Sequence, residues 1–132
     1  AQSPVDPEAL FGRVKLSDGA AYAQSKLALT MWSCNMALSL KDEGPAIIAV
    51  NPRSMLGSKM VKEAYGVVGG DLRIGAEILT RAALTDEFAA ASGQYFDNDI
   101  GQFASPHPDA LNPQKSEPIV SVIEAALTEI TR

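Results

Sequence analysis

The segment PAIIAVNP, residues 45–52, decides the fold class of this 132-residue chain. A proline opens the segment, an Asn-Pro turn signal closes it, and residues 46–50 between them are all apolar. Short apolar runs between turn residues are typical of strands that are covered on both faces of a parallel sheet. We therefore expect a buried parallel strand over residues 46–50.

A long helix is predicted immediately before this strand. Residues 20–41 contain neither Gly nor Pro, and helix-forming residues dominate them. Ser17 or Asp18 can cap the start, and Gly44 with Pro45 stops the chain soon after the end. Apolar side chains crowd most of this helix, so we expect it to be buried on more than one side or against a partner subunit. A helix, a short loop and a buried strand form half of an α/β crossover unit.

The rest of the chain predicts only a few further elements. These are a mostly irregular segment over residues 1–19, a loop over 53–70, a helix from the cap Asp71 to about residue 84, a short strand with a turn in 93–101, and a final helix over 116–131 with Ser116 as cap. Two strands are few for a sheet, since sheets usually contain about 4–6. We therefore expect the chain to be part of a larger α/β fold.

Composition narrows the classes of function. The chain has 46% apolar and 20% charged residues, which is typical of one globular domain, and its formal net charge is −5. Because phosphate binding needs concentrated Lys and Arg, nucleic acid is an unlikely partner. The sequence predicts no membrane span. Cys34 is the only cysteine, so we expect neither disulfides nor a metal site, and a reduced, cytoplasmic setting.

The stretch AAYAQSKLALTMW, residues 20–32, contains a candidate catalytic pair. Tyr22 and Lys26 are four residues apart and so lie on one side of the predicted helix. A phenol has a pKa of about 10, and a nearby ammonium lowers that pKa toward the range that is useful for proton transfer. The spacing alone is common by chance, and a tyrosine packed under a lysine stem explains it equally well.

Three segments together resemble the short-chain dehydrogenase/reductase family. YAQSKLAL (22–29) resembles its active-site helix with the Tyr-x-x-x-Lys signature, and AVNPRSMLGSKM (49–60) resembles the strand and turn that follow. GQYFDNDIGQFASPHPDALNPQ (93–114) is similar to the C-terminal region of the branch with retinol-dehydrogenase-like and light-dependent protochlorophyllide-reductase-like members. The resemblance implies the C-terminal portion of a doubly wound, Rossmann-like parallel sheet in a three-layer α/β/α arrangement, incomplete in this chain.

The resemblance also implies an activity and its residues. Tyr22 would be the general acid/base of hydride transfer between an alcohol or carbonyl and a nicotinamide cofactor, NAD or NADP. Lys26 would hold the nicotinamide ribose hydroxyls and lower the pKa of Tyr22. The loop after the strand would close over the nicotinamide through Pro52, Arg53, Ser54, Met55 and Ser58. Residues 60–68 would form a lid over an apolar alcohol or carbonyl substrate.

Two departures from the family pattern stand out. Arg53 occupies the place where the family usually has a glycine, and glycine allows close approach of the backbone to a cofactor. The glycine-rich turn that binds a pyrophosphate is absent, because GVVGG (66–70) has neither a preceding strand nor the right spacing. Ser3 and Ser17 match the family's catalytic serine by position alone, and we expect that serine to lie before residue 1.

We therefore expect residues 1–132 to be the C-terminal half of one Rossmann-fold domain, with a homo-oligomer formed through the active-site helix. One alternative keeps Tyr22 and Lys26 in an epimerase or dehydratase that uses its cofactor transiently. Another is a truncated, non-catalytic product that only associates with partners.

Overall fold

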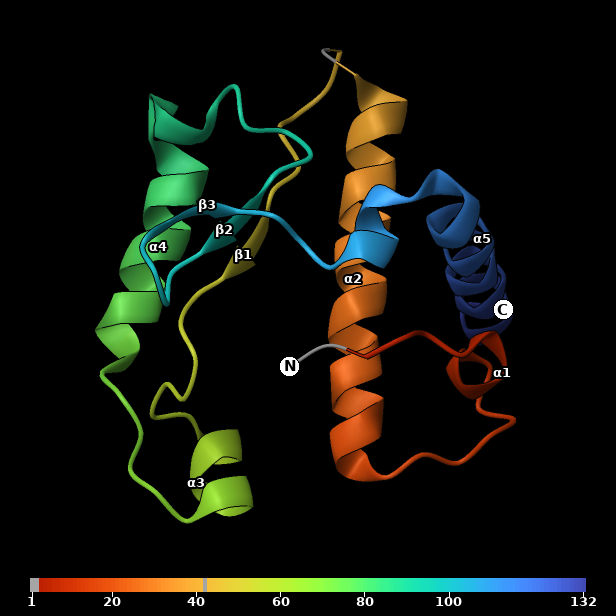
Figure 1. The fold of residues 1–132 in the computed structure, drawn as a ribbon, viewed down its shortest axis with the longest axis horizontal. Helices are drawn as coiled ribbons and strands as arrows, with labels where there is room; N and C mark the ends of the chain where they lie inside the picture. Colours follow the sequence, from red (N-terminus) through yellow and green to blue (C-terminus); the bar gives the residue numbers. More distant parts are fainter. Residues whose placement is uncertain (1–2, 42) are drawn as a thin grey trace.

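The computed structural model describes residues 3–41 and 43–132, and this part of the chain is mixed α/β (Figure 1). Its five α-helices are α1 (Pro7–Leu10), α2 (Asp18–Leu40), α3 (Lys59–Tyr65), α4 (Leu72–Leu84) and α5 (Pro113–Ile130). Its strands are β1 (Ala49–Asn51), β2 (Tyr95–Asp97) and β3 (Gln102–Ala104), and its 3₁₀ turns are η1 (Asp86–Phe88) and η2 (Pro108–Leu111).

The sheet is small and mixed, with the strand order β1-β2-β3. β1 pairs with β2 in parallel, with Val50 opposite Phe96, and β2 pairs with β3 in antiparallel, with Phe96 opposite Phe103. The observed strand β1 therefore begins later, ends later and is shorter than the strand predicted over residues 46–50. The prediction of full burial was wrong, because β1 is an edge strand in the described residues and all three of its residues are half-buried.

One face of the sheet packs against α4 and η1. Ile78 of α4, Phe88 of η1 and Phe96 of β2 form a buried cluster with exposed fractions of 1%, 1% and 3%. The ring of Phe103 on β3 completes the packing, with its centroid 5.1 Å from that of Phe96 and 5.4 Å from that of Phe88. The predicted helix with Asp71 as cap is confirmed, since the Asp71 side chain accepts a hydrogen bond from the Arg73 amide and α4 follows.

The long helix α2 begins as predicted, because the Ser17 hydroxyl accepts a hydrogen bond from the Ala20 amide. Leu27 and Met31 of α2 are buried in a second cluster with Ala110 of η2 and Ile119 of α5. The expectation of burial on more than one side was wrong within this chain: the opposite side of α2 stays open, and Leu29 on it is 51% exposed.

Three local features differ from the sequence prediction. The last helix is capped by Asn112, whose side chain accepts from the Gln114 amide, and not by Ser116, which lies inside α5 and is buried. The loop predicted over 53–70 contains the short helix α3, and the turn after β2 leads into β3, which forms a hairpin with it. The pairing of β3 with β2 depends on how their backbones meet, which local sequence patterns do not carry.

The elements lie side by side in the order α4, sheet, α2 and α5 in Figure 1, with α1 next to α5. β1 runs toward the end of the molecule where α2 begins and where α3 lies (Figure 1). None of the helices in the described residues combines the length and the hydrophobicity that are needed to cross a membrane.

Candidate functional site

Tyr22 and Lys26 form a pair on the open side of α2. The Nζ atom of Lys26 lies 5.3 Å from the centroid of the Tyr22 ring, within the range of a cation–π contact. Both residues are exposed, Tyr22 to 41%. Among the described residues no carboxylate forms an ion pair with Lys26. The pair therefore presents a phenol and an uncompensated cation to solvent.

The helix itself sets this orientation. Ala23 and Leu27, which directly follow Tyr22 and Lys26, are buried, with Leu27 at 0% exposure. Residues i and i+4 share a helix face, so anchoring Ala23 and Leu27 turns Tyr22 and Lys26 outward together. The Ser25 hydroxyl donates a 2.7 Å hydrogen bond to the Tyr22 carbonyl and does not compete for the phenol.

A second group of polar side chains gathers where the parallel strands β1 and β2 end. The Asn51 amide nitrogen donates to Asp97 Oδ1 at 2.8 Å and to Asp99 Oδ2 at 2.9 Å. Ser54 donates to Asp99 through its backbone amide at 2.8 Å and through its hydroxyl at 2.5 Å. These bonds tie the start of the loop after β1 to the turn after β2.

The ionisation of this group follows from its hydrogen bonds. The Ser54 hydroxyl, the Ser54 amide and the Asn51 side chain lower the pKa of Asp99, and the charge of Arg53 acts in the same direction. Burial raises the pKa of Tyr95, and the negative charges of Asp97 and Asp99 add to that effect. The Asp99 carboxylate is thus held ionised as an acceptor for the loop.

The loop after β1 has an unusual backbone. Arg53 has φ +126° and Met55 has φ +54°, both in the region that favours glycine. The Arg53 amide donates to Asn51 Oδ1 at 3.3 Å, and the Pro52 carbonyl accepts a 3.0 Å bond from the Asn98 side chain. Contacts from the β2–β3 turn therefore hold Arg53 in a conformation that an arginine rarely adopts.

Residues 58–68 extend away from the rest of the protein. The residues before and after them meet in a tight backbone contact, which we call the glycine clasp (Gly57, Gly69 and Gly70). The Gly57 amide donates to the Gly70 carbonyl at 2.7 Å, and the Gly70 amide donates to the Met55 carbonyl at 2.8 Å. A Cβ atom on Gly57 would lie 2.8 Å from the Val68 carbonyl oxygen, and one on Gly69 would lie 2.7 Å from the Gly57 Cα. Only glycine fits at positions 57 and 69 of this contact.

Helix α3 lies within this excursion and exposes apolar side chains. Ser58 caps it, since its hydroxyl oxygen accepts from the Val61 amide at 3.3 Å, so that only the hydroxyl proton of Ser58 is left for another acceptor. Met60 is 50% exposed, Tyr65 66% and Val68 88%. The segment predicted as a lid is therefore a short helix between two loop segments, which exposes Met60 and Tyr65 and buries Val61.

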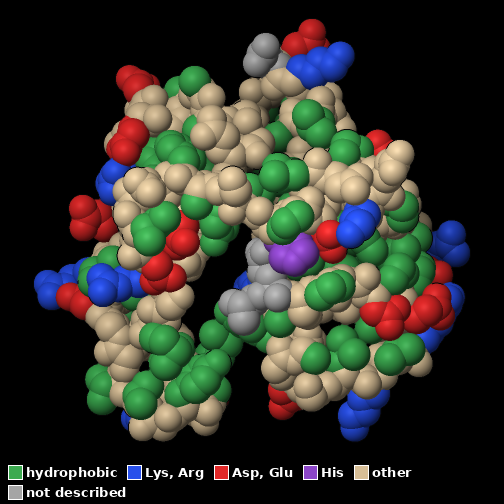
Figure 2. Space-filling view, in the orientation of Figure 1, with side chains coloured by type: hydrophobic (Ala, Val, Ile, Leu, Met, Phe, Trp, Pro, Cys, Tyr) green, Lys and Arg blue, Asp and Glu red, His purple; other side chains and the backbone are tan. Residues whose placement is uncertain are grey.

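The two groups of predicted site residues lie at one end of the molecule but do not touch through any hydrogen bond or ion pair in the described residues. The structure brings Tyr22 to Lys26, and it separately brings Ser54 to the end of the sheet. Figure 2 shows an open gap between the part around α3 and the part around α2, with hydrophobic side chains on the α3 side. This gap separates the two groups.

Asn51 and Asp99 are the site residues that the sequence analysis did not select. The only signal in the sequence was the alternation of Asp97 and Asp99 at the end of a predicted short strand. Asp97 shapes the turn after β2, since its carboxylate accepts from the Asp99 amide at 3.0 Å. The described residues contain no cluster of three or more side chains that could hold a metal ion.

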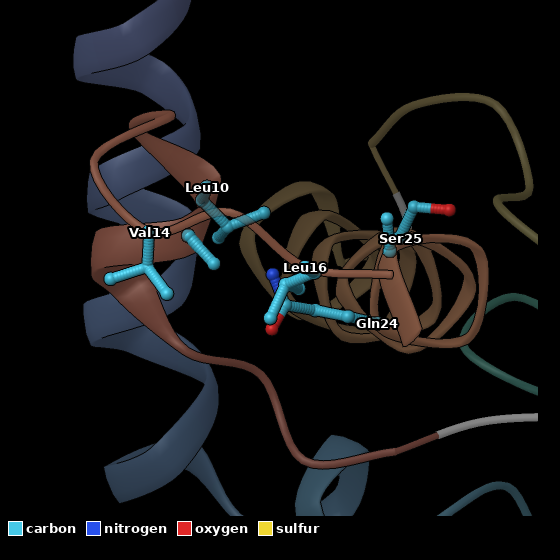
Figure 3. A pocket seen from close by; sticks show the side chains of 7 residues that line it. Leu10, Val14, Leu16, Gln24 and Ser25 are labelled. Atoms are coloured by element: carbon cyan, nitrogen blue, oxygen red, sulfur yellow. The ribbon is translucent and has the colours of Figure 1, made fainter. Parts of the chain in front are cut away.

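Neither of two cavities on the described surface is lined by Tyr22 or Lys26. One of about 210 Å³ lies between the loop after α1 and the start of α2, with Leu10 and Val14 on one side and Leu16 beside Gln24 on the other (Figure 3). The Gln24 side chain is engaged there, because its oxygen accepts from the Asp6 amide at 2.8 Å. The second cavity, of about 450 Å³, lies at the opposite end of α2.

Comparisons of the chain with protein-family models, with curated proteins and with solved structures found no match.

Proposed function

We propose that this chain carries the acid–base pair of a nicotinamide-dependent oxidoreductase of the short-chain dehydrogenase/reductase type, which interconverts an alcohol and a carbonyl. The observation that carries the proposal is the exposed Tyr22 phenol with the Lys26 ammonium 5.3 Å from its ring, while no carboxylate of the described residues is paired with that lysine. A lysine that serves only solubility or helix stability does not require a tyrosine ring beside it.

Tyr22 is the group that moves the proton. In the reductive direction its hydroxyl donates to the oxygen of the substrate carbonyl, and in the oxidative direction its phenolate accepts the proton of the alcohol. The Lys26 ammonium stabilises the negative charge that develops on the Tyr22 oxygen, because opposite charges within a few ångströms favour the ionised form. A nicotinamide cofactor supplies or accepts the hydride when it is bound.

The residues of this chain fit one end of such a cofactor. Lys26 has hydrogen-bond donors available for ribose hydroxyls, since no acidic side chain in the described residues occupies them. Pro52, Arg53, Ser54, Met55 and Ser58 would face the nicotinamide from the other side of the gap. The glycine-type backbone of Arg53 supports this assignment, because it preserves a turn in which the backbone approaches a ligand closely.

The finer fold assignment belongs to the same proposal. The outer edge of β1 has no strand partner in the described residues, and Ile48 and Val50 near it are only half-buried. Parallel strands are usually covered on both faces and paired on both edges. We place β1 and β2 in the C-terminal portion of a doubly wound sheet that continues beyond β1, where the pyrophosphate would also bind.

Helix α3 suits an apolar substrate. It exposes Met60 and Tyr65, with the exposed Val68 after it, and the part around α3 borders the gap across from the part around α2 (Figure 2). If α3 closed over an apolar substrate, these side chains would be removed from water, which is favourable in proportion to the apolar area covered.

The test is a hydride-transfer assay on the purified protein with NADH or NADPH and a panel of apolar aldehydes and ketones. Tyr22→Phe should lower kcat by roughly 100-fold or more while the cofactor still binds, since general acid catalysis usually contributes that much. Lys26→Met should weaken cofactor binding as well as turnover. Lys15→Met, which removes another exposed lysine, is the matched control and should change neither. Full turnover by Tyr22→Phe would overturn the proposed role.

A second candidate is an association module without catalysis. The unpaired edge of β1 and the exposed Leu29 on α2 favour it, because both are typical of surfaces that another chain covers. If neither nicotinamide cofactor changes the fluorescence of Trp32 or the melting temperature, this candidate replaces the first. A bound cofactor that is retained and regenerated during turnover would instead indicate the epimerase or dehydratase chemistry.

A further inference from the structure

The cavity of about 450 Å³ is far from the proposed catalytic pair. It lies between the C-terminal half of α2, η2, the start of α5 and the segment before β2. Leu38 on its wall is sixteen residues after Tyr22, which corresponds to about 24 Å along a helix. Its size falls within the usual range for small-molecule sites, roughly 300–1,000 Å³.

Among the described residues that line this cavity, the charge has one sign. Lys41 is the only charged residue among the described residues that line it, and no Asp or Glu does so, although the whole chain has a net charge of −5. None of the ion pairs in the described residues involves Lys41. The charge of the cavity therefore differs from that of the acidic protein as a whole, and it favours a ligand with an anionic group.

A buried hydroxyl also faces this cavity without a partner. Ser116 is 4% exposed and lines the wall, and its hydroxyl makes no hydrogen bond with any other described residue. The Ser116 oxygen itself keeps some exposed surface, because no side-chain oxygen or nitrogen in the described residues is both fully buried and without a hydrogen-bond partner. A nearly buried hydroxyl without a partner is unusual, because leaving it unpaired costs free energy that a ligand acceptor recovers.

The remaining wall is apolar and partly open. Leu38 is 66% exposed and Leu111 is 59% exposed, and both line the cavity. Large apolar side chains held at the mouth of a cavity suit the hydrocarbon part of a small ligand.

We propose that this cavity is a binding site for a small amphipathic carboxylate, a short hydrocarbon chain that ends in an acid. The carboxylate accepts a hydrogen bond from the Ser116 hydroxyl and is balanced by the charge of Lys41, and the hydrocarbon chain covers Leu38 and Leu111. The site is separate from the Tyr22–Lys26 pair and does not depend on the proposed oxidoreductase activity.

Cys34 provides the readout. It is the only thiol in the chain, it lines this cavity, and its Sγ donates a weak 3.8 Å hydrogen bond to the Gly93 carbonyl. Burial raises the pKa of the Cys34 thiol, so its alkylation is slow and limited by access. A ligand in the cavity should therefore slow alkylation further.

The experiment measures alkylation of Cys34 by iodoacetamide, followed by intact mass, with hexanoate or with its neutral analogue hexanamide. We expect hexanoate to protect the thiol with a dissociation constant on the order of 1 mM, as suits a ligand of this size. We expect hexanamide to protect at least fivefold more weakly. Lys41→Met should abolish this difference and Ser116→Ala should weaken both ligands, whereas Lys62→Met, on α3, should leave protection unchanged.

Two results would overturn the proposal. If hexanoate does not protect Cys34 at any concentration that leaves the protein folded by circular dichroism, the cavity is not such a site. If hexanoate and hexanamide protect equally, the site does not select the carboxylate. Neither result bears on turnover by Tyr22, so failure of this proposal is distinguishable from failure of the proposed function.

Discussion

At the scale of single residues, Arg53 carries a backbone conformation that glycine adopts without strain. Its φ of +126° places the Cβ atom against its own backbone, and surrounding hydrogen bonds hold it there. Residues in such regions cost of order 1–3 kcal/mol each, and they persist only when the surrounding structure imposes them. The sequence analysis noted an arginine in place of the family's glycine, and the structure shows that the glycine conformation remains.

We expect Arg53→Gly to stabilise the protein by roughly 1 kcal/mol, because relief of strain exceeds the extra entropy that glycine brings to the unfolded chain. Urea denaturation would measure this as a higher midpoint. Arg53→Ala is the matched control, since it removes the same guanidinium group but keeps the Cβ atom. A gain of equal size in Arg53→Ala would show that the charge, and not the backbone, is responsible.

Asp99 makes the stability of the loop after β1 dependent on pH. Its folded pKa is lowered, first by the Ser54 hydroxyl, so its contribution is present above the unfolded pKa of about 3.9 and is lost as pH falls through the lowered folded value. We expect Asp99→Asn to lower the free energy of unfolding by roughly 1 kcal/mol at neutral pH, a modest figure because solvent screens this exposed group.

The measurement compares urea midpoints at neutral pH and at about pH 3, which is below the unfolded pKa. The difference between wild type and Asp99→Asn should shrink at the lower pH. Asp86→Asn, on η1, serves as the control, since the Asp86 side chain makes no hydrogen bond or ion pair within the described residues. A difference that persists unchanged at low pH would mean that the Asp99 charge does not hold the loop.

At the scale of elements, the glycine clasp sets where the α3 excursion begins and ends. The backbones of Gly57 and Gly70 meet through a 2.7 Å hydrogen bond, and residues 55–57 lie against residues 69–70 with no room for a side chain on Gly57. The excursion is thereby confined to residues 58–68. Its position beside the gap follows from this contact and not from packing of α3 itself, because most of α3 is exposed.

Gly57→Ala should destabilise the protein by about 2 kcal/mol, since the added Cβ atom would lie 2.8 Å from the Val68 oxygen and 2.9 Å from the Gly70 oxygen. Gly70→Ala should be close to neutral, because the nearest atom to its Cβ is the Met55 oxygen at 3.8 Å. Hydrogen exchange of the Gly57 and Gly70 amides would show opening of the clasp in the first variant only. Equal effects of the two substitutions would contradict the assigned contact.

Element boundaries were predictable where a local signal defines them. Ser17 before α2 and Asp71 before α4 are caps that act within three residues, and both were recognised. Asn112 was missed as the cap of α5 because Ser116 and Pro118 also match a helix start. The hydrogen bond from the Gln114 amide to the Asn112 side chain decides between the two and places Ser116 inside the helix.

At the scale of the whole molecule, the described chain exposes apolar surface on several elements. Leu29 on α2 and Leu79 on α4 are each 51% exposed, but they lie on opposite sides of the sheet (Figure 1). The side of α2 with Leu29 also carries Tyr22 and Lys26. We propose that the homo-oligomer expected from the sequence forms through the part of this side around Leu29, so that Tyr22 and Lys26 stay open to a cofactor.

We therefore expect Leu29→Glu to shift the protein toward the monomer in light scattering coupled to size exclusion, because a charge in an apolar interface must be desolvated. Leu79→Glu changes a side chain of the same type and the same exposed fraction, and it should leave the assembly state unchanged. Dissociation by Leu79→Glu alone would move the interface from α2 to α4.

The sequence by itself determined the mixed α/β class, the long helix α2 and the placement of Tyr22 and Lys26 on one side of it. Each of these depends on residues within a few positions of one another, so a period of 3.6 and a capping residue suffice to predict it. Tertiary structure alone decided the extent of β1, the pairing of β3 and the joining of Asn51 to Asp97 and Asp99. The first and the last of these depend on contacts between segments about 46 positions apart, such as the 2.8 Å bond from Asn51 to Asp97, and local patterns cannot specify which distant backbone will meet which.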